Sequence, residues 1–120
     1  MTQYDIKDYI HHLSFHVKNF GKLIPMTLIY MHRLVEKNNL NVTSENVVKL
    51  FITSFHMAQK NTYRSERIRN KFLCEVYRIS TLELFHLEQF FLKSEIKFHV
   101  DQKEIDAVNY MILESGLGFI

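Results

Sequence analysis

Apolar residues recur every three or four positions along most of the chain, a spacing that places them on one side of an α-helix. Short polar breaks divide this pattern into separate stretches. We therefore expect six helices, over about 5–20, 25–37, 43–60, 67–77, 80–94 and 101–114. Between the last two stretches, Ile96, Phe98 and Val100 alternate with polar residues, which indicates a short extended piece.

Residues at several breaks favour helix ends. Gly21 is expected just past the end of the first helix, where glycine is common. Pro25 suits the first position of the second helix, because the N–H that it lacks would have no partner there. Thr43 is expected to cap the third helix. The segments 80–83 and 101–104 have the capping-box pattern and should open the fifth and sixth helices.

The third stretch is apolar over more than half of its circumference. The remaining narrow polar strip holds Lys49, Thr53, His56 and Lys60. A helix with so wide an apolar arc is typically surrounded by others. We therefore expect this helix at the centre of the fold.

Composition supports a single all-α domain spanning residues 1–120. The chain is 47% apolar and 23% charged, as in ordinary globular proteins. One proline and three glycines are too few for the many turns of a sandwich or barrel. The core is expected over about 6–100, followed by an extra C-terminal helix over about 101–115.

Charge and cysteine usage exclude several classes of protein. A formal charge of +2 is too small to indicate a nucleic-acid partner by itself. The lone Cys74 excludes an internal disulfide framework and a cysteine-rich zinc site, and it reads as a small buried hydrophobe. No apolar run reaches the roughly 18 residues of a membrane span, and the first residues are too charged for a signal peptide. We expect an intracellular protein of the nucleus or cytoplasm.

Glu88 is the most informative single residue, because it falls near the middle of the apolar face of the fifth helix. That face is formed by Leu84, Phe85, Leu87, Phe91 and Leu92. An unpaired carboxylate there would cost several kcal/mol. Two interpretations remain open: an internal ion pair with a cation of the third or fourth helix, or a face that a partner covers.

The histidines give weaker signals. His32 lies within the apolar arc of the second helix, so we expect a core histidine, with a metal ligand or general base as the alternative. His12 and His16 have the spacing of two zinc ligands on one helix face, but no third ligand is evident. A surface cluster is the simpler interpretation, and a metal-dependent enzyme the alternative.

A basic segment spans 60–71 and contains Lys60, Arg64, Arg67, Arg69 and Lys71. Charge runs are usually solvated, although this one could face phosphate or an acidic partner. The sequence shows no nucleophile elbow and no glycine-rich phosphate loop. We therefore expect no catalytic residues, no cofactor and no metal.

Four segments together resemble a cyclin box, and specifically the P/U-type cyclins. They are LIYMHRL at 28–34, VTSENVVKLFITS at 42–54, MAQK at 57–60 and ISTLELFHLEQFFL at 79–92. The last is the most specific, and the resemblance covers about 6–100. It implies a five-helix box around a central third helix, and therefore a cyclin-like box with one added C-terminal helix.

The resemblance also implies a function. Cyclins of this type bind and activate cyclin-dependent protein kinases that act in phosphate signalling, through a lysine ending the third helix and a glutamate on the fifth. These positions fall on Lys60 and Glu88. Docking of this face would shift the kinase toward its active conformer. Phe91, Arg64 and Arg67 are candidate interface residues, although Phe91, like Phe51 and Phe55, could equally belong to the core.

The chain departs from the family pattern at several positions. In the segment at 28–34, His32 stands where the family has an aspartate before the arginine. The first-helix arginine that pairs with that aspartate in the family falls near His12. We expect a pH-sensitive contact between these histidines in place of an ion pair. Asn61 replaces a phenylalanine and Arg78 a glycine. The alternative function is a cyclin-box-like adaptor that binds other proteins or nucleic acid through the basic segment.

Overall fold

The computed structural model describes residues 6–17, 19–62 and 70–114, with the backbone alone described at residues 6 and 70–73. It contains six helices and no strand within those ranges, which confirms the all-α prediction. The helices are α1 (Ile6–His16), α2 (Phe20–Lys37), α3 (Val47–Thr62), α4 (Asn70–Tyr77), α5 (Thr81–Lys93) and α6 (Gln102–Glu114).

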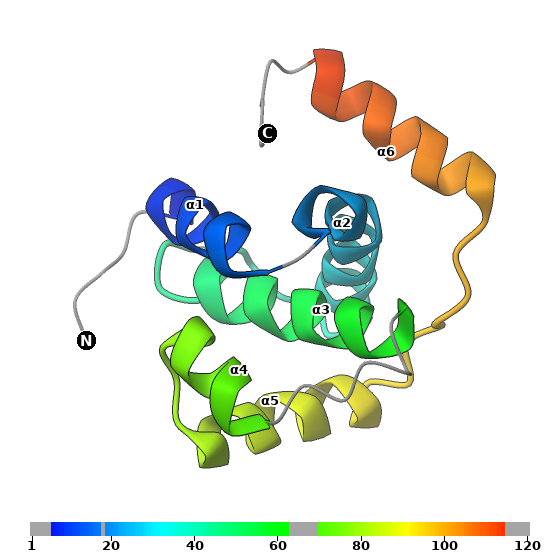
Figure 1. Ribbon diagram of the computed structural model, residues 1–120. Helices are drawn as coiled ribbons and strands as arrows, with labels where there is room; N and C mark the ends of the chain where they lie inside the picture. Colours follow the sequence, from blue (N-terminus) through cyan, green and yellow to red (C-terminus); the bar gives the residue numbers. More distant parts are fainter. Residues whose placement is uncertain (1–5, 18, 63–69, 115–120) are drawn as a thin grey trace.

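Helix α3 is the centre of the fold, as its wide apolar arc predicts. In Figure 1 it runs between α1 and α2 on one side and α4 and α5 on the other. Every residue from Leu50 to Gln59 is buried. The ring of Phe55 stacks on that of Phe51 at 5.9 Å, and packs against Phe20 and Tyr77 from the neighbouring helices.

Helix α2 begins five residues earlier than its local signals predict. It starts at Phe20, so Gly21 and Pro25 both lie inside it rather than at a helix end. Phe20, Leu23 and Ile24 have helical spacing and are buried in the main core. The burial of these side chains outweighs the backbone hydrogen bond that the proline removes.

Two predicted capping residues, Thr43 and Ser80, make the expected hydrogen bonds, although the helix after Thr43 begins four residues later than predicted. The Asn46 N–H donates to Thr43 Oγ1 at 3.3 Å, and the Thr43 N–H donates to Asn46 Oδ1 at 2.8 Å. Regular helix then begins at Val47. At α5, the Glu83 N–H donates to Ser80 Oγ at 3.1 Å. Each cap satisfies backbone N–H groups that the first turn leaves without a partner.

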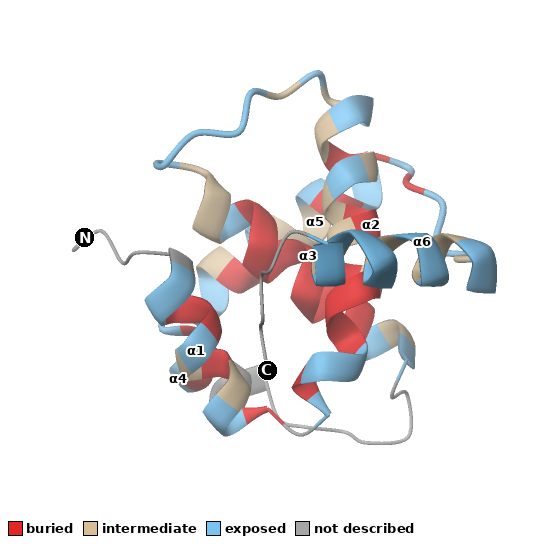
Figure 2. Cartoon of the chain, turned by 90° about the horizontal axis from the view of Figure 1, so that it is seen from above, coloured by how far each residue is buried: buried red, intermediate tan, exposed pale blue. Residues whose placement is uncertain are grey.

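Helix α6 is attached to the other helices through α2. Residues 96–101, which lead to it, form neither helix nor strand. The Arg33 guanidinium on α2 donates to the carbonyl oxygens of Lys97 and His99 at 2.6 and 2.9 Å, and to the Glu104 carboxylate at 2.7 Å. Figure 2 shows buried residues gathered in the inner helices, whereas α6 has none.

Candidate functional site

The last turns of α3 and the middle of α5 bring the two predicted site residues together. The Lys60 ammonium donates to Glu88 Oε1 at 2.9 Å. The same oxygen accepts a hydrogen bond from Nε2 of His56, one turn before Lys60 on α3. Lys60 is half-exposed, the Glu88 side chain is 17% exposed and that of His56 only 1%. The carboxylate therefore sits at the boundary between core and solvent.

Glu88 is ionised at neutral pH. The hydrogen bond from His56, supported by the one from Lys60 and opposed by burial, lowers the pKa of Glu88 from 4.5 to about 2. Both hydrogen bonds end on Oε1. Oε2 accepts none from the residues that the structure describes, so it keeps the capacity to accept from another molecule.

The two interpretations of Glu88 each describe part of the structure. An internal cation is present, as the ion-pair interpretation requires, and it comes from α3. The apolar face around Glu88, however, is divided into two halves. Leu84 and Phe91 on one side are buried, whereas Phe85 and Leu92 on the other are 52% and 48% exposed. The carboxylate lies at the border of an uncovered apolar strip formed by Phe85 and Leu92.

The structure corrects the assignment of Phe91 as a candidate interface residue. Phe91 is completely buried, with its ring 5.6 Å from both Tyr30 and Phe98. Phe51 and Phe55 also belong to the core. A side chain that is already covered on all sides adds no apolar area to a docking surface. The other two candidates, Arg64 and Arg67, lie outside the described residues.

His56 is a member of the site that sequence reasoning missed. Besides Glu88, its ring contacts the Tyr77 hydroxyl, which lies 3.1 Å from Nδ1. The Tyr77 hydroxyl in turn donates to Gln59 Oε1 at 2.9 Å. The available signal was the spacing, because His56 precedes Lys60 by four residues and shares its polar strip.

Of the other histidines, His32 differs from its prediction, whereas His12 and His16 lie together near the surface, as the surface-cluster interpretation expects. His32 is not a core residue: its side chain is 70% exposed and lies 3.4 Å from Glu36 on the same helix. His12 donates to the Val76 carbonyl at 2.8 Å, and its ring lies 4.7 Å from that of His16. The expected contact between His12 and His32 is therefore replaced by separate partners. Periodicity places His32 beside apolar residues, but no neighbouring helix covers it.

Two departures from the family pattern have local explanations. Arg78 follows α4 with a φ of 61°, the left-handed conformation that glycine adopts most easily. The glycine of the family pattern fits that position for this reason. The Asn61 amide donates to the Tyr30 hydroxyl at 2.9 Å, and that hydroxyl donates to the Phe98 carbonyl. Asn61 thus joins the end of α3 to α2.

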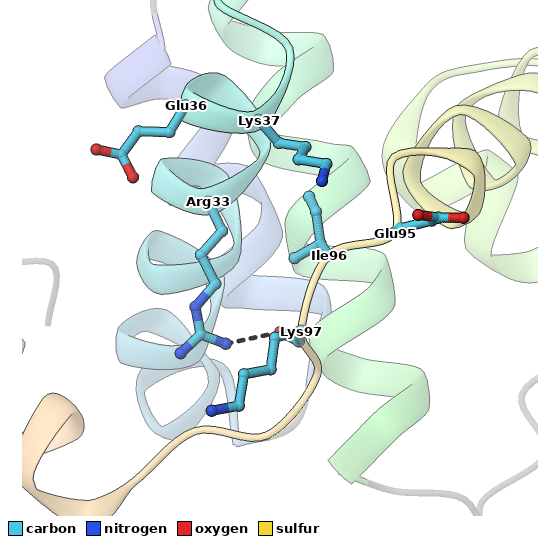
Figure 3. A pocket seen from close by; sticks show the side chains of 6 residues that line it. All are labelled: Arg33, Glu36, Lys37, Glu95, Ile96 and Lys97. Carbon is cyan, nitrogen blue, oxygen red and sulfur yellow. Dashed lines mark hydrogen bonds between the residues drawn. The ribbon is translucent and has the colours of Figure 1, made fainter.

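A concave region lies between the end of α2 and the segment after α5, away from Lys60 and Glu88. Figure 3 shows this open pocket of about 390 Å³, lined by Arg33, Glu36, Lys37, Glu95, Ile96 and Lys97. Its cationic and acidic side chains nearly balance. The Arg33 guanidinium is already bonded to the chain leading to α6, so the lining favours no single class of ligand.

Within the described ranges, no group of three or more His, Cys, Asp or Glu side chains is arranged to hold a metal ion. None of the described helices has the length and apolar character required to cross a bilayer. Cys74 is buried and free, as its sequence context predicts.

Comparison with known proteins gives one match. No curated protein and no solved structure is significantly similar to the chain. The sequence model of the family described as Cyclin matches residues 2–100, which include α1 to α5 and end before α6. That family is regulatory and non-catalytic, and its domain implies a protein partner. The match covers most of the chain and agrees with the helices packed around α3, and on this basis the chain belongs to the cyclin family.

Proposed function

We propose that this protein is the regulatory subunit of a cyclin-dependent protein kinase, which it binds and activates. Within the cyclin family, we assign it to the P/U-type on the strength of the segments at 28–34, 42–54, 57–60 and 79–92. Such a partner implies an intracellular site of action, in the nucleus or cytoplasm. The protein itself would supply no catalytic group.

One observation carries the proposal: the half-buried Glu88 carboxylate lies between Lys60 and an uncovered apolar strip. Oε2 of Glu88 can accept hydrogen bonds from backbone N–H groups of a docked kinase. Lys60 can donate to carbonyl or carboxylate oxygens beside it. Phe85 and Leu92 supply apolar area at the same place. A polar anchor next to exposed aromatic and aliphatic side chains is typical of the centre of a protein interface.

The mechanism is a shift between two kinase conformers. A regulatory subunit that binds the active kinase conformer more tightly than the inactive one raises the population of the active conformer. The size of the shift is set by the ratio of the two affinities. Lys60 and Glu88 are well suited to this role because their positions are held by packed helices. Rigid anchors lose little conformational freedom on binding.

The test is to mix the purified chain with each cyclin-dependent kinase of its source organism. Complex formation is measured by calorimetry, and kinase activity with a peptide substrate. We expect Phe85→Ser to weaken binding by about tenfold or more, because an interface residue near the centre contributes about 1–2 kcal/mol. Glu88→Ala should weaken binding at least as much.

Leu113→Ser is the matched control, since Leu113 is an exposed apolar residue on α6, away from α3 and α5. It should bind like the unmodified chain. Circular dichroism establishes that each variant keeps its helical content. The proposal is wrong if no kinase binds, or if Phe85→Ser and Leu113→Ser bind equally well.

A further inference from the structure

His56 is a buried imidazole whose two nitrogens both face polar partners. Its side chain is 1% exposed, so its ring nitrogens must find their hydrogen bonds within the protein. Nε2 faces Oε1 of Glu88 on α5, and Nδ1 lies 3.1 Å from the Tyr77 hydroxyl on α4. The ring thus joins the core to the carboxylate at the candidate docking surface.

The arrangement of donors and acceptors determines how many protons the ring carries. Glu88 is ionised and can only accept, so Nε2 must donate to it. The single proton of the Tyr77 hydroxyl is donated to Gln59 Oε1 at 2.9 Å. The hydroxyl oxygen is therefore an acceptor toward His56, and Nδ1 must donate as well. A histidine that donates from both nitrogens is an imidazolium.

The groups around the ring are compatible with this charge. Burial raises the pKa of Tyr77 far above its ordinary value, so its hydroxyl stays neutral. Glu88 provides the countercharge in direct contact. Two titratable groups contact the ring directly, Glu88 from α5 and Tyr77 from α4, and Lys60 of α3 shares Oε1 of Glu88 with it. Cys74 of α4 and Tyr9 of α1, whose hydroxyl donates to the Tyr77 carbonyl, lie beside Tyr77.

We propose that His56 is a protonated positioning residue that fixes the Glu88 carboxylate and gives the His56–Lys60–Glu88 cluster a net charge of +1. The imidazolium neutralises the carboxylate from inside, so the charge of Lys60 is left for a partner. Loss of the proton leaves the cluster neutral. Docking through this cluster therefore depends on pH and favours a kinase surface with an acidic group opposite Lys60. The pH dependence of docking rests on the proposed function, whereas the charge of His56 does not.

The charge is tested on the isolated protein by nuclear magnetic resonance of its ¹⁵N-labelled histidines. We expect the His56 resonances of a ring protonated on both nitrogens at about pH 6, and loss of that signature as the pH rises. Glu88→Gln should shift the loss to lower pH, because the countercharge is gone. A neutral ring with one protonated nitrogen at about pH 6 would overturn the proposal.

The consequence for docking is tested by measuring kinase affinity between about pH 6 and about pH 8. The unmodified chain should bind about three- to tenfold more weakly at the upper limit, the effect of one charge near an interface. His56→Gln, which keeps hydrogen-bonding capacity without a charge, should lose this dependence. His32→Gln, which changes an exposed histidine of α2, should retain it.

If His56→Gln does not fold, Tyr77→Phe is used in its place. Tyr77→Phe removes the acceptor for the Nδ1 proton of His56 and should move both the resonance change and the binding change to lower pH. Equal pH dependence in the unmodified chain and in a folded His56→Gln variant would contradict the proposal. Absence of kinase binding at every pH would reject the proposed function, while the resonances of the isolated protein still decide the charge of His56.

Discussion

Helices α3 and α6 are of similar length, with 16 and 13 residues, but different forces hold them in place. In α3 every residue from Leu50 to Gln59 is buried, and the surrounding helices cover it. In α6 no residue is buried, and the Arg33 bonds to Glu104 and to the preceding chain attach it to α2. Apolar burial therefore stabilises the centre, whereas α6 is attached by these polar contacts and by the partly buried Ile112, which packs against the core. The family match covers the first region and stops before the second.

The strongest test of this contrast removes one apolar side chain from each helix. Phe55→Ala should lower the free energy of unfolding by about 3–5 kcal/mol, because it leaves a cavity among Phe20, Phe51 and Tyr77. Leu113→Ala on the exposed side of α6 should change it by less than about 0.5 kcal/mol. Urea denaturation measures both. Similar losses in the two variants would show that α6 is as much a part of the core as α3.

A second test concerns the carboxylate of Glu88, which His56 and Lys60 of α3 hold at the edge of the core. The pKa of Glu88 is lowered to about 2 in the folded protein, against 4.5 ordinarily. Its ionised form therefore stabilises the fold fully above about pH 4.5, and this contribution is lost as the pH falls toward 2. Glu88→Gln should cost about 1–3 kcal/mol at neutral pH and flatten the acid dependence in that window.

Glu36→Gln is the control for that measurement, because Glu36 is exposed and pairs only with His32 across 3.4 Å among the described residues. Its acid denaturation, followed by circular dichroism, should match that of the unmodified chain. If Glu88→Gln also matches the unmodified chain, the Glu88 hydrogen bonds do not contribute to stability.

The smallest expected effect is local to α6. Arg33→Met removes the bonds to Glu104 and to the carbonyl oxygens before α6. Amide hydrogen exchange in Gln102–Glu114 should accelerate by about tenfold, equivalent to about 1–2 kcal/mol of local stability. Exchange within α3 should not change. Lys97→Met, which leaves the carbonyl of that residue in place, should affect neither helix, and equal acceleration in α3 would mean that the two regions unfold together.

The capping residues and the wide apolar arc were reliable signals in this chain, whereas two residues that favour helix ends were not. The capping residues Thr43 and Ser80 bind the backbone groups that their positions predict. The wide apolar arc of 43–60 identified the central helix, because a helix that is apolar over most of its circumference must be covered over most of it. The predicted start of α2 was wrong, because burial of an apolar side chain outweighed the local signals. Gly21 and Pro25 are local signals of a helix end, and the burial of Phe20 overrode them.

The sequence by itself determined that the chain is helical, that α3 is central and that Glu88 lies on an apolar face. Only the tertiary structure decided which half of that face is covered, because Phe85 and Phe91 are the same residue type on one helix face. It also decided that His56 is buried and His32 exposed. Periodicity shows which residues share a side of a helix. Whether a neighbour covers that side depends on contacts between residues far apart in the chain, which no local pattern contains.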